Sequence, residues 1–220
     1  HSFAAWLAQC PNVLRTVHNN FDYTGFLTYQ KKIERKIAEN VFKVKFIAIS
    51  KSVKKTEKCK FGIECQLIDN WIDRTDFLPL KDIAEKEKLR KSFGIDCKAF
   101  VIISVGSCTS VKNHDHILLA LSEIKENFQD ILYLHIGDGH LLPKEKKLAN
   151  QLGLHNHVSF LRNQKDIRSW LVSSDIFVMP SEYEGVGNAC LEAMSCGMPI
   201  IVYNVKGLNE LVSNEINGFI

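Results

Sequence analysis

The chain has 220 residues, of which 45% are hydrophobic and 24% are charged, and its formal net charge is +3. This composition is typical of globular proteins and excludes the disordered and fibrous classes, and the length suffices for one large or two small domains. The small net charge argues against a dedicated nucleic-acid binder. No apolar run approaches the ~20 residues of a transmembrane helix, and no signal peptide opens the chain. We therefore expect a cytoplasmic protein without a nucleic-acid partner.

In chain order, apolar runs typical of strands alternate with amphipathic runs typical of helices. The first part predicts strands at 13–18, 46–50 and 65–69 and helices at 28–42 and 51–59, after a helical pattern that already begins at the first residue. A segment rich in turn formers, 69–82, leads into a charged helix and is interpreted as an interdomain connector. The second part predicts strands at 99–105, 131–137, 157–161, 175–180 and 199–204 and helices at 113–128, 141–153, 165–174, 188–197 and 207–214. This alternation predicts parallel sheets covered by helices.

Two further groups of residues are the cysteines and the clustered basic residues. Seven cysteines, an odd number without a Cys-x-x-Cys pair, lie mostly in apolar runs and are interpreted as reduced core residues. Basic residues gather at 31–36 and again at 51–60. Two solvated helix faces are the simpler interpretation of these basic residues, and attraction to an anionic membrane surface is the alternative.

The densest functional signal is the segment PSEYEGVGNACLEAMSCGMPIIVYN at 180–204, which follows a strand at the carboxyl edge of the predicted sheet. Glycines at 185 and 187 allow a close approach of the backbone to a ligand, and Asn188 is a suitable N-cap for a helix that begins at Ala189. The N–H groups of that first turn attract phosphate. Glu184 and Glu192, eight residues apart, place two acceptors on either side of this anion site. A nucleotide-sugar has hydroxyls on both sides of a diphosphate and fits such a site.

A simpler interpretation is that Glu192 only compensates its own helix dipole and that Glu184 is a solvated loop residue. For either glutamate alone this interpretation is acceptable. The combination of both with two loop glycines and an N-cap favours the binding site.

The same segment resembles the EGxGNxxLEAMxxGxP pattern of the glycosyltransferase group 1 family, also called family 4, whose members are retaining enzymes with the two-domain GT-B fold. The resemblance extends over nearly the whole chain. It implies an α/β fold with two Rossmann-like domains, the N-terminal one incomplete and the C-terminal one nearly complete. We expect a remnant of the acceptor-side domain at 1–77, a connector helix at 78–97 and the donor-binding domain at 98–220.

The resemblance also implies roles for particular residues. Glu184 would contact the hydroxyls of the donor sugar and Glu192 the ribose, and Lys112 would neutralise the diphosphate leaving group. His18 matches a histidine used near the donor sugar, although a histidine that is hydrogen-bonded at a strand end is nearly as good an interpretation. The remaining donor-binding candidates are Gly106, Gly185, Val186, Gly187, Asn188, Leu161 and Arg162. We expect Glu184, Glu192 and Lys112 to line one cleft.

The expected function is transfer of a hexose, with retention, from a UDP- or GDP-linked sugar to a glycan or lipid-linked acceptor at the cytoplasmic membrane face, in polysaccharide or glycolipid biosynthesis. No Asp-x-Asp occurs in the sequence, and the eight histidines offer no ligand spacing more convincing than that of His114 and His116 at a helix start, so we expect no metal and no cofactor. Ser107 stands where the family commonly has an arginine. Because of this departure, a catalytically silent nucleotide-sugar binding fragment is the alternative function. A sugar-nucleotide epimerase is a third and weaker hypothesis.

Overall fold

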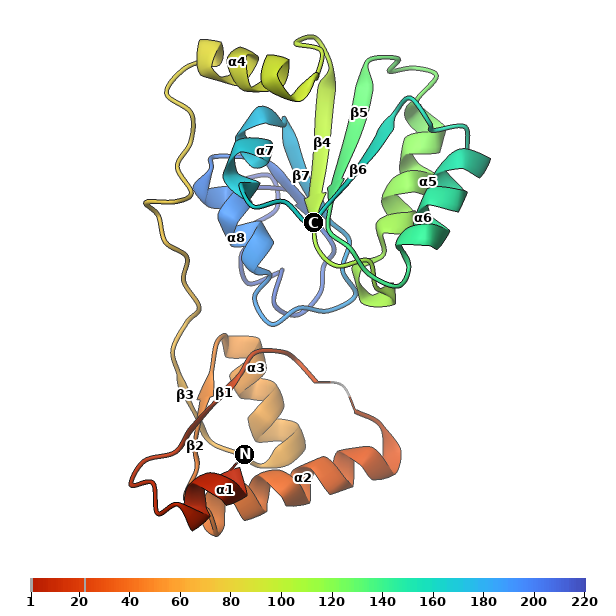
Figure 1. The fold of residues 1–220 in the computed structure, drawn as a ribbon. Helices are drawn as coiled ribbons and strands as arrows, with labels where there is room; N and C mark the ends of the chain where they lie inside the picture. The colour runs from red at the N-terminus through yellow and green to blue at the C-terminus, as the bar shows by residue number, and fades with distance from the viewer. Residues whose placement is uncertain (1, 22) are drawn as a thin grey trace. The chain divides into compact units, whose positions relative to one another are not determined.

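The computed structural model describes residues 2–21 and 23–220, which form two compact units (Figure 1). Unit 1 comprises the residues up to Trp71 together with Tyr183–Gly187 and Lys206–Leu211. Unit 2 comprises Ile72–Glu182, Asn188–Val205 and Val212–Ile220. Both units are built on parallel sheets, so the predicted α/β class with two Rossmann-like units is confirmed.

Unit 1 contains a three-stranded parallel sheet in the order β1-β2-β3. Its strands are β1 (Leu14–Val17), β2 (Lys45–Ala48) and β3 (Cys65–Leu67). Its helices are α1 (Ser2–Leu7), α2 (Gly25–Asn40) and α3 (Lys51–Thr56), and α3 continues into the π-helical turn η1 (Glu57–Phe61). The sequence placed each of these strands and helices to within a few residues.

A buried ion pair joins α2 to η1. The guanidinium of Arg35 donates to both carboxylate oxygens of Glu57, at 2.7 and 3.2 Å, and both side chains are at most 3% exposed. The same guanidinium lies over the ring of Phe61, 4.0 Å from its centroid. The interpretation of the basic cluster at 31–36 as a solvated face is therefore wrong for Arg35, whose charge is compensated inside the unit.

Unit 2 contains a five-stranded parallel sheet in the order β6-β5-β4-β7-β8. The strands are β4 (Phe100–Val105), β5 (Ile131–Ile136), β6 (Val158–Arg162), β7 (Ile176–Met179) and β8 (Ile200–Val202). Helices α5 (His114–Ile124) and α6 (Leu142–Gln151) cover one face (Figure 1). The other face is covered by α7 (Ile167–Ser173) and α8 (Asn188–Ser195), and α4 (Ile83–Phe93) packs against α7 (Figure 1). A short 3-10 turn, η2 (Ser110–Lys112), precedes α5.

The structure corrects two sequence expectations. The segment predicted as a helix at 207–214 forms turns instead. Gly207 has a φ of +90°, which interrupts a helix at its first residue, and the Glu210 carboxylate accepts hydrogen bonds from the first backbone N–H groups of α3. All seven cysteines are free, but three of them are exposed and are not core residues: Cys10, Cys59 and Cys97.

No helix within the described residues is long and apolar enough to span a bilayer.

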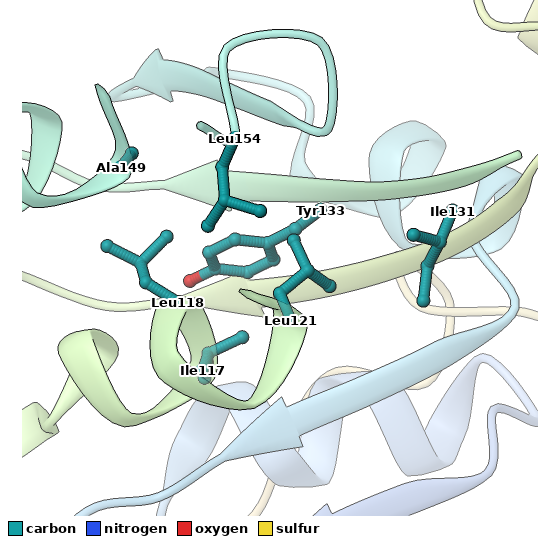
Figure 2. Packing of buried hydrophobic residues seen from close by; sticks show 7 residues of the cluster. All are labelled: Ile117, Leu118, Leu121, Ile131, Tyr133, Ala149 and Leu154. Carbon is teal, nitrogen blue, oxygen red and sulfur yellow. The ribbon is translucent and has the colours of Figure 1, made fainter. Parts of the chain in front are cut away.

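One core cluster of unit 2 lies between the sheet and the helix pair α5 and α6. Tyr133 of β5 is fully buried beneath Leu118 and Leu121 of α5, and Leu154, just after α6, packs on the same cluster (Figure 2). Tyr133 also shares a 2.6 Å hydrogen bond with the Ser104 hydroxyl of β4, which satisfies its buried oxygen. This cluster attaches α5, and the loop that precedes it, to the sheet.

We expect Leu118→Ala to destabilise the chain by about 2–5 kcal/mol, because truncation leaves a cavity in this closed cluster. Leu119→Ala is the matched control, since Leu119 is the next residue of the same helix and is 45% exposed. Its effect should stay within about 0.5 kcal/mol. Denaturant unfolding of both variants measures the difference, and equal losses would show that the cluster does not hold α5.

Candidate functional site

The order in which the chain adds strands to the sheet of unit 2 reverses at β4, in the centre of the sheet. From β4 the chain proceeds outward through β5 and β6, and it then returns to place β7 on the opposite side of β4. In open α/β sheets, ligands bind outside the carboxyl ends of the strands at such a topological switch point. The two loops at this point are the one from β4 to α5 and the one that follows β7. They are joined by hydrogen bonds from the Asn113 side chain to the Pro180 carbonyl (3.1 Å) and from the Glu182 N–H to the Val111 carbonyl (2.8 Å).

Glycines allow the ends of β4 and β5 to approach each other closely. Gly137 has a φ of +151°, and a Cβ at this position would lie 1.8 Å from the Gly106 carbonyl oxygen. Gly139 has a φ of +157°, and its Cβ would lie 2.6 Å from the Cys108 carbonyl oxygen. A Cβ on Gly106 itself would lie 3.4 Å from the Lys112 side chain. The structure thus brings together the predicted residues Gly106 and Lys112.

Leu161 and Arg162 lie at the end of β6, at the same edge of the sheet. Arg162 has a φ of +55°, and its carbonyl accepts a hydrogen bond from the Gly137 N–H at 3.1 Å. Its guanidinium lies 3.8 Å from the Asp138 carboxylate. Asp138 was not singled out from the sequence, although its place between two glycines of a strand-to-helix turn is a signal that could have identified it.

Glu192 and Asn188 lie on α8. The helix begins at Asn188, one residue before the predicted start, and the preceding residue, Gly187, has a φ of +76°. The N-cap role of Asn188 stays a prediction. Glu192 is half-buried, and burial raises the pKa of its carboxyl group above the usual value. A half-buried carboxylate is stabilised when it accepts a hydrogen bond from a donor such as a ribose hydroxyl.

Glu184, Gly185, Val186 and Gly187 belong to unit 1, in the segment that packs beside β1 and α3. The Asn20 side chain donates to the Glu184 carbonyl at 2.8 Å, and a Cβ on Gly185 would lie 1.9 Å from the His18 carbonyl oxygen.

His18 follows β1 directly and is exposed, and Val186 is 6% exposed. The structure therefore brings His18 together with Gly185.

Two residues near this segment were missed in the sequence, Asn20 and Ser50. The Ser50 hydroxyl donates to the Gly185 carbonyl at 3.0 Å. Both residues were missed because they are remote in sequence from Gly185 and belong to no motif. Because Glu184 belongs to unit 1 and Glu192 and Lys112 to unit 2, their common cleft stays a prediction.

Four buried side chains of unit 2 could hold a metal ion: Cys108, His114, His135 and Glu145. Burial and the hydrogen bond with Glu145 raise the pKa of the Cys108 thiol to about 12, so the thiol is protonated. Burial and the neighbouring His114 lower the pKa of His135 to about 4, which keeps this imidazole neutral. Burial opposes ionisation of Glu145, but hydrogen bonds from His114 and Cys108 outweigh it and lower the pKa of the carboxyl group.

The fold of the chain is similar to those of solved structures of one class. Over 99% of its length, the chain matches the Anabaena protein HepE in complex with UDP and glucose, with a TM-score of 0.86 at 21% identity, over 59% of that chain. It also matches WaaG, a glycosyltransferase involved in lipopolysaccharide biosynthesis, with a TM-score of 0.71 over 89% of this chain and 55% of WaaG, at 21% identity. The architecture is that of the GT-B glycosyltransferases.

Residues 85–220 match the family model "Glycosyl transferases group 1", and the chain belongs to this family. Among curated relatives, it is 34% identical to the Escherichia coli UDP-Gal:alpha-D-GlcNAc-diphosphoundecaprenol alpha-1,3-galactosyltransferase, over 72% of this chain and 41% of the enzyme. It is 28% identical to the Bacillus anthracis N-acetyl-alpha-D-glucosaminyl L-malate synthase, over 74% of this chain and 42% of that enzyme. The chain thus spans less than half the length of these two relatives.

We expect Gly137→Ala to destabilise unit 2 and to weaken nucleotide binding, since a Cβ 1.8 Å from the Gly106 carbonyl must force the two strand ends apart. Gly106→Ala is the matched control for stability, because the atoms nearest to its added methyl group belong to side chains, the flexible Lys112 chain at 3.4 Å and His114 Nε2 at 3.7 Å. Thermal unfolding should separate the two variants by several degrees. Equal melting temperatures would show that the strand ends are free to separate.

Proposed function

We propose that this chain carries the donor site of a retaining glycosyltransferase that moves a hexose from a nucleotide-sugar to a glycan or lipid-linked acceptor, in polysaccharide or glycolipid biosynthesis. The observation that carries the proposal is the segment from Glu184 to Glu192, which lies within the family match and follows a strand at the topological switch point. The similarity to HepE, whose structure contains UDP, and to the E. coli galactosyltransferase that uses UDP-Gal supports a UDP-linked donor over a GDP-linked one.

The proposed roles follow from the chemistry of each group. Glu184 accepts hydrogen bonds from the sugar hydroxyls and Glu192 from the ribose, while the amides from Gly185 to Asn188 bind the phosphates. Leu161 and Arg162 surround the base.

In the transfer step, the bond from the anomeric carbon to the diphosphate breaks, and the acceptor oxygen bonds to the same face of the sugar. The acceptor proton leaves on the released diphosphate. Lys112 stabilises the negative charge that develops there, and His18 lies near the sugar. The absence of an Asp-x-Asp motif supports transfer without a divalent cation at the diphosphate.

A catalytically silent nucleotide-sugar binding fragment is the competing function, because Ser107 supplies no second cation for the leaving group. Two measurements distinguish the two functions. Calorimetric titration with UDP, GDP, ADP and their sugar conjugates identifies the bound nucleotide, and release of free sugar or transfer to an acceptor reports turnover. Binding without turnover would favour the silent fragment.

We expect Glu192→Gln to weaken UDP-sugar binding about tenfold, because hydrogen bonds to a charged acceptor are stronger than those to a neutral amide by about 1.4 kcal/mol. The same change should raise the melting temperature of the ligand-free chain. A raised pKa means that the folded state loses stability as pH rises through the folded value, so the charge costs stability at neutral pH, and Gln removes this cost. The exposed Glu123→Gln on α5 is the control. Unchanged affinity would exclude Glu192 from the ribose site.

We propose that an anionic surface, such as the headgroups of the cytoplasmic membrane face, binds unit 1. A hollow of about 450 Å³ in this unit is lined by four lysines and one carboxylate: Lys51, Lys55, Lys60, Lys206 and Glu210. Each lysine near an anionic bilayer contributes about 1 kcal/mol of attraction, and salt screens this attraction.

We expect Lys51→Ala combined with Lys55→Ala to reduce retention on vesicles containing phosphatidylserine by about thirtyfold at low salt. Lys144→Ala with Lys147→Ala on α6, two exposed lysines of unit 2, makes the same change in net charge. If both double variants lose retention equally, net charge and not this hollow is responsible. Equal retention on uncharged vesicles would contradict the electrostatic basis.

A further inference from the structure

Beneath the loop from β4 to α5 lies a compact group of metal-ligand side chains. One donor atom from each of Cys108, His114, His135 and Glu145 lies within 4.8 Å of all the others. Cys108 lies in the loop after β4, His114 begins α5, His135 lies on β5 and Glu145 lies on α6. Four separate elements therefore converge on one point.

Two distances within the group are close to those between the ligands of a tetrahedral ion, and all four donor atoms lie within 4.8 Å of one another. The Cys108 Sγ lies 3.1 Å from His135 Nε2, and His114 Nδ1 lies 3.3 Å from a Glu145 oxygen. Around zinc, with bonds of about 2.0 to 2.3 Å, tetrahedral ligand atoms are about 3.3 to 3.8 Å apart. An ion at the centre of the group would require any donor atoms that are farther apart than this range to move closer together.

Burial and an unsatisfied oxygen point to a ligand. None of the four residues is more than 4% exposed. The second carboxylate oxygen of Glu145, Oε2, is buried and has no hydrogen-bond partner in the described part of the chain. An unpaired buried carboxylate oxygen is costly, and each such atom in a native fold needs an explanation. Coordination of a cation would supply one.

The outer partners of His135 complete the arrangement. Its Nε2 faces the cluster, while its Nδ1 lies 3.1 Å from the Ser104 hydroxyl and 3.3 Å from the Tyr133 hydroxyl. Histidines that bind metals hold their second ring nitrogen in this way, which fixes the tautomer and the orientation of the ring. The same Tyr133 belongs to the core cluster of Figure 2, so the ring is held by a rigid part of the sheet.

We propose that Cys108, His114, His135 and Glu145 form a structural site for a divalent metal ion, with zinc as the ion that this set of donors favours. One thiolate and one carboxylate neutralise the two charges of the ion, and two neutral imidazoles complete the four ligands. Binding replaces the thiol proton of Cys108, which is released to solvent. The proposal does not depend on the proposed function, although the site would hold both ends of the segment that carries Lys112.

The test uses cobalt and zinc on the whole chain after removal of bound metal with a chelator. We expect one equivalent of Co²⁺ to produce the visible bands of a tetrahedral site together with a thiolate-to-cobalt charge-transfer band. Zinc added back should displace the cobalt and raise the melting temperature. Elemental analysis should count one zinc per chain.

Cys108→Ser should remove the charge-transfer band and weaken metal binding at least tenfold, whereas Cys97→Ser, which changes an exposed cysteine, should alter neither. Circular dichroism establishes that each variant is folded. Glu145→Gln provides a second variant, which should weaken binding while it keeps the charge-transfer band. The proposal is overturned if the folded wild-type chain shows no tetrahedral cobalt spectrum, or if Cys108→Ser leaves the spectrum unchanged.

Discussion

The candidate donor site of unit 2 depends on one backbone contact, the approach of Gly137 to the Gly106 carbonyl where β4 and β5 end. These two strands pair in register along six residues each, from Phe100 opposite Ile131 to Val105 opposite Ile136. The buried cluster around Tyr133 packs α5 and α6 against one face of these strands. Because the strand ends cannot separate, both following loops begin at a fixed point of the sheet. Asp138 follows this point directly, Lys112 lies six residues after Gly106, and the Arg162 carbonyl accepts a hydrogen bond from the Gly137 N–H, so the positions of all three depend on it.

The sequence predicts the sheets well for a physical reason. Strands of parallel sheets are buried on both faces and therefore appear as continuous apolar runs, as in 99–105 and 131–137. Expectations failed where a distant contact outweighs the local pattern. The run 207–214 has helical periodicity, but Gly207 at φ +90° and the Glu210 contacts with the start of α3 favour turns. Arg35 has the local pattern of a solvated residue, yet it is buried because Glu57, 22 positions away, neutralises it.

The residues of the candidate site also divide into those that the local sequence reveals and those that tertiary contacts bring to the site. The segment around Glu184 to Glu192 is local, so its glycines, its carboxylates and the helix that follows are visible in the sequence. Asn20 and Ser50 owe their places to tertiary contacts with residues more than 130 positions away, so no sequence spacing reveals them. Asp138 is intermediate, because only its position between two glycines marks it in the sequence. The group of Cys108, His114, His135 and Glu145 is the clearest case. Its members are separated by up to 37 positions along the chain, so no ligand spacing relates all four, and only the convergence of β4, β5, α5 and α6 brings them together.

A metal in this group is compatible with sugar transfer that uses no metal at the diphosphate. All four donor residues are buried, and a tetrahedral site made from them has no open position for a phosphate oxygen. The ion would affect sugar transfer only by restricting the movement of a loop. Cys108 and His114 lie on either side of Lys112 in the sequence, so an ion that binds both limits the movement of the segment between them. The charge that faces the diphosphate would remain that of Lys112, and the ion would determine how firmly this charge is held in place.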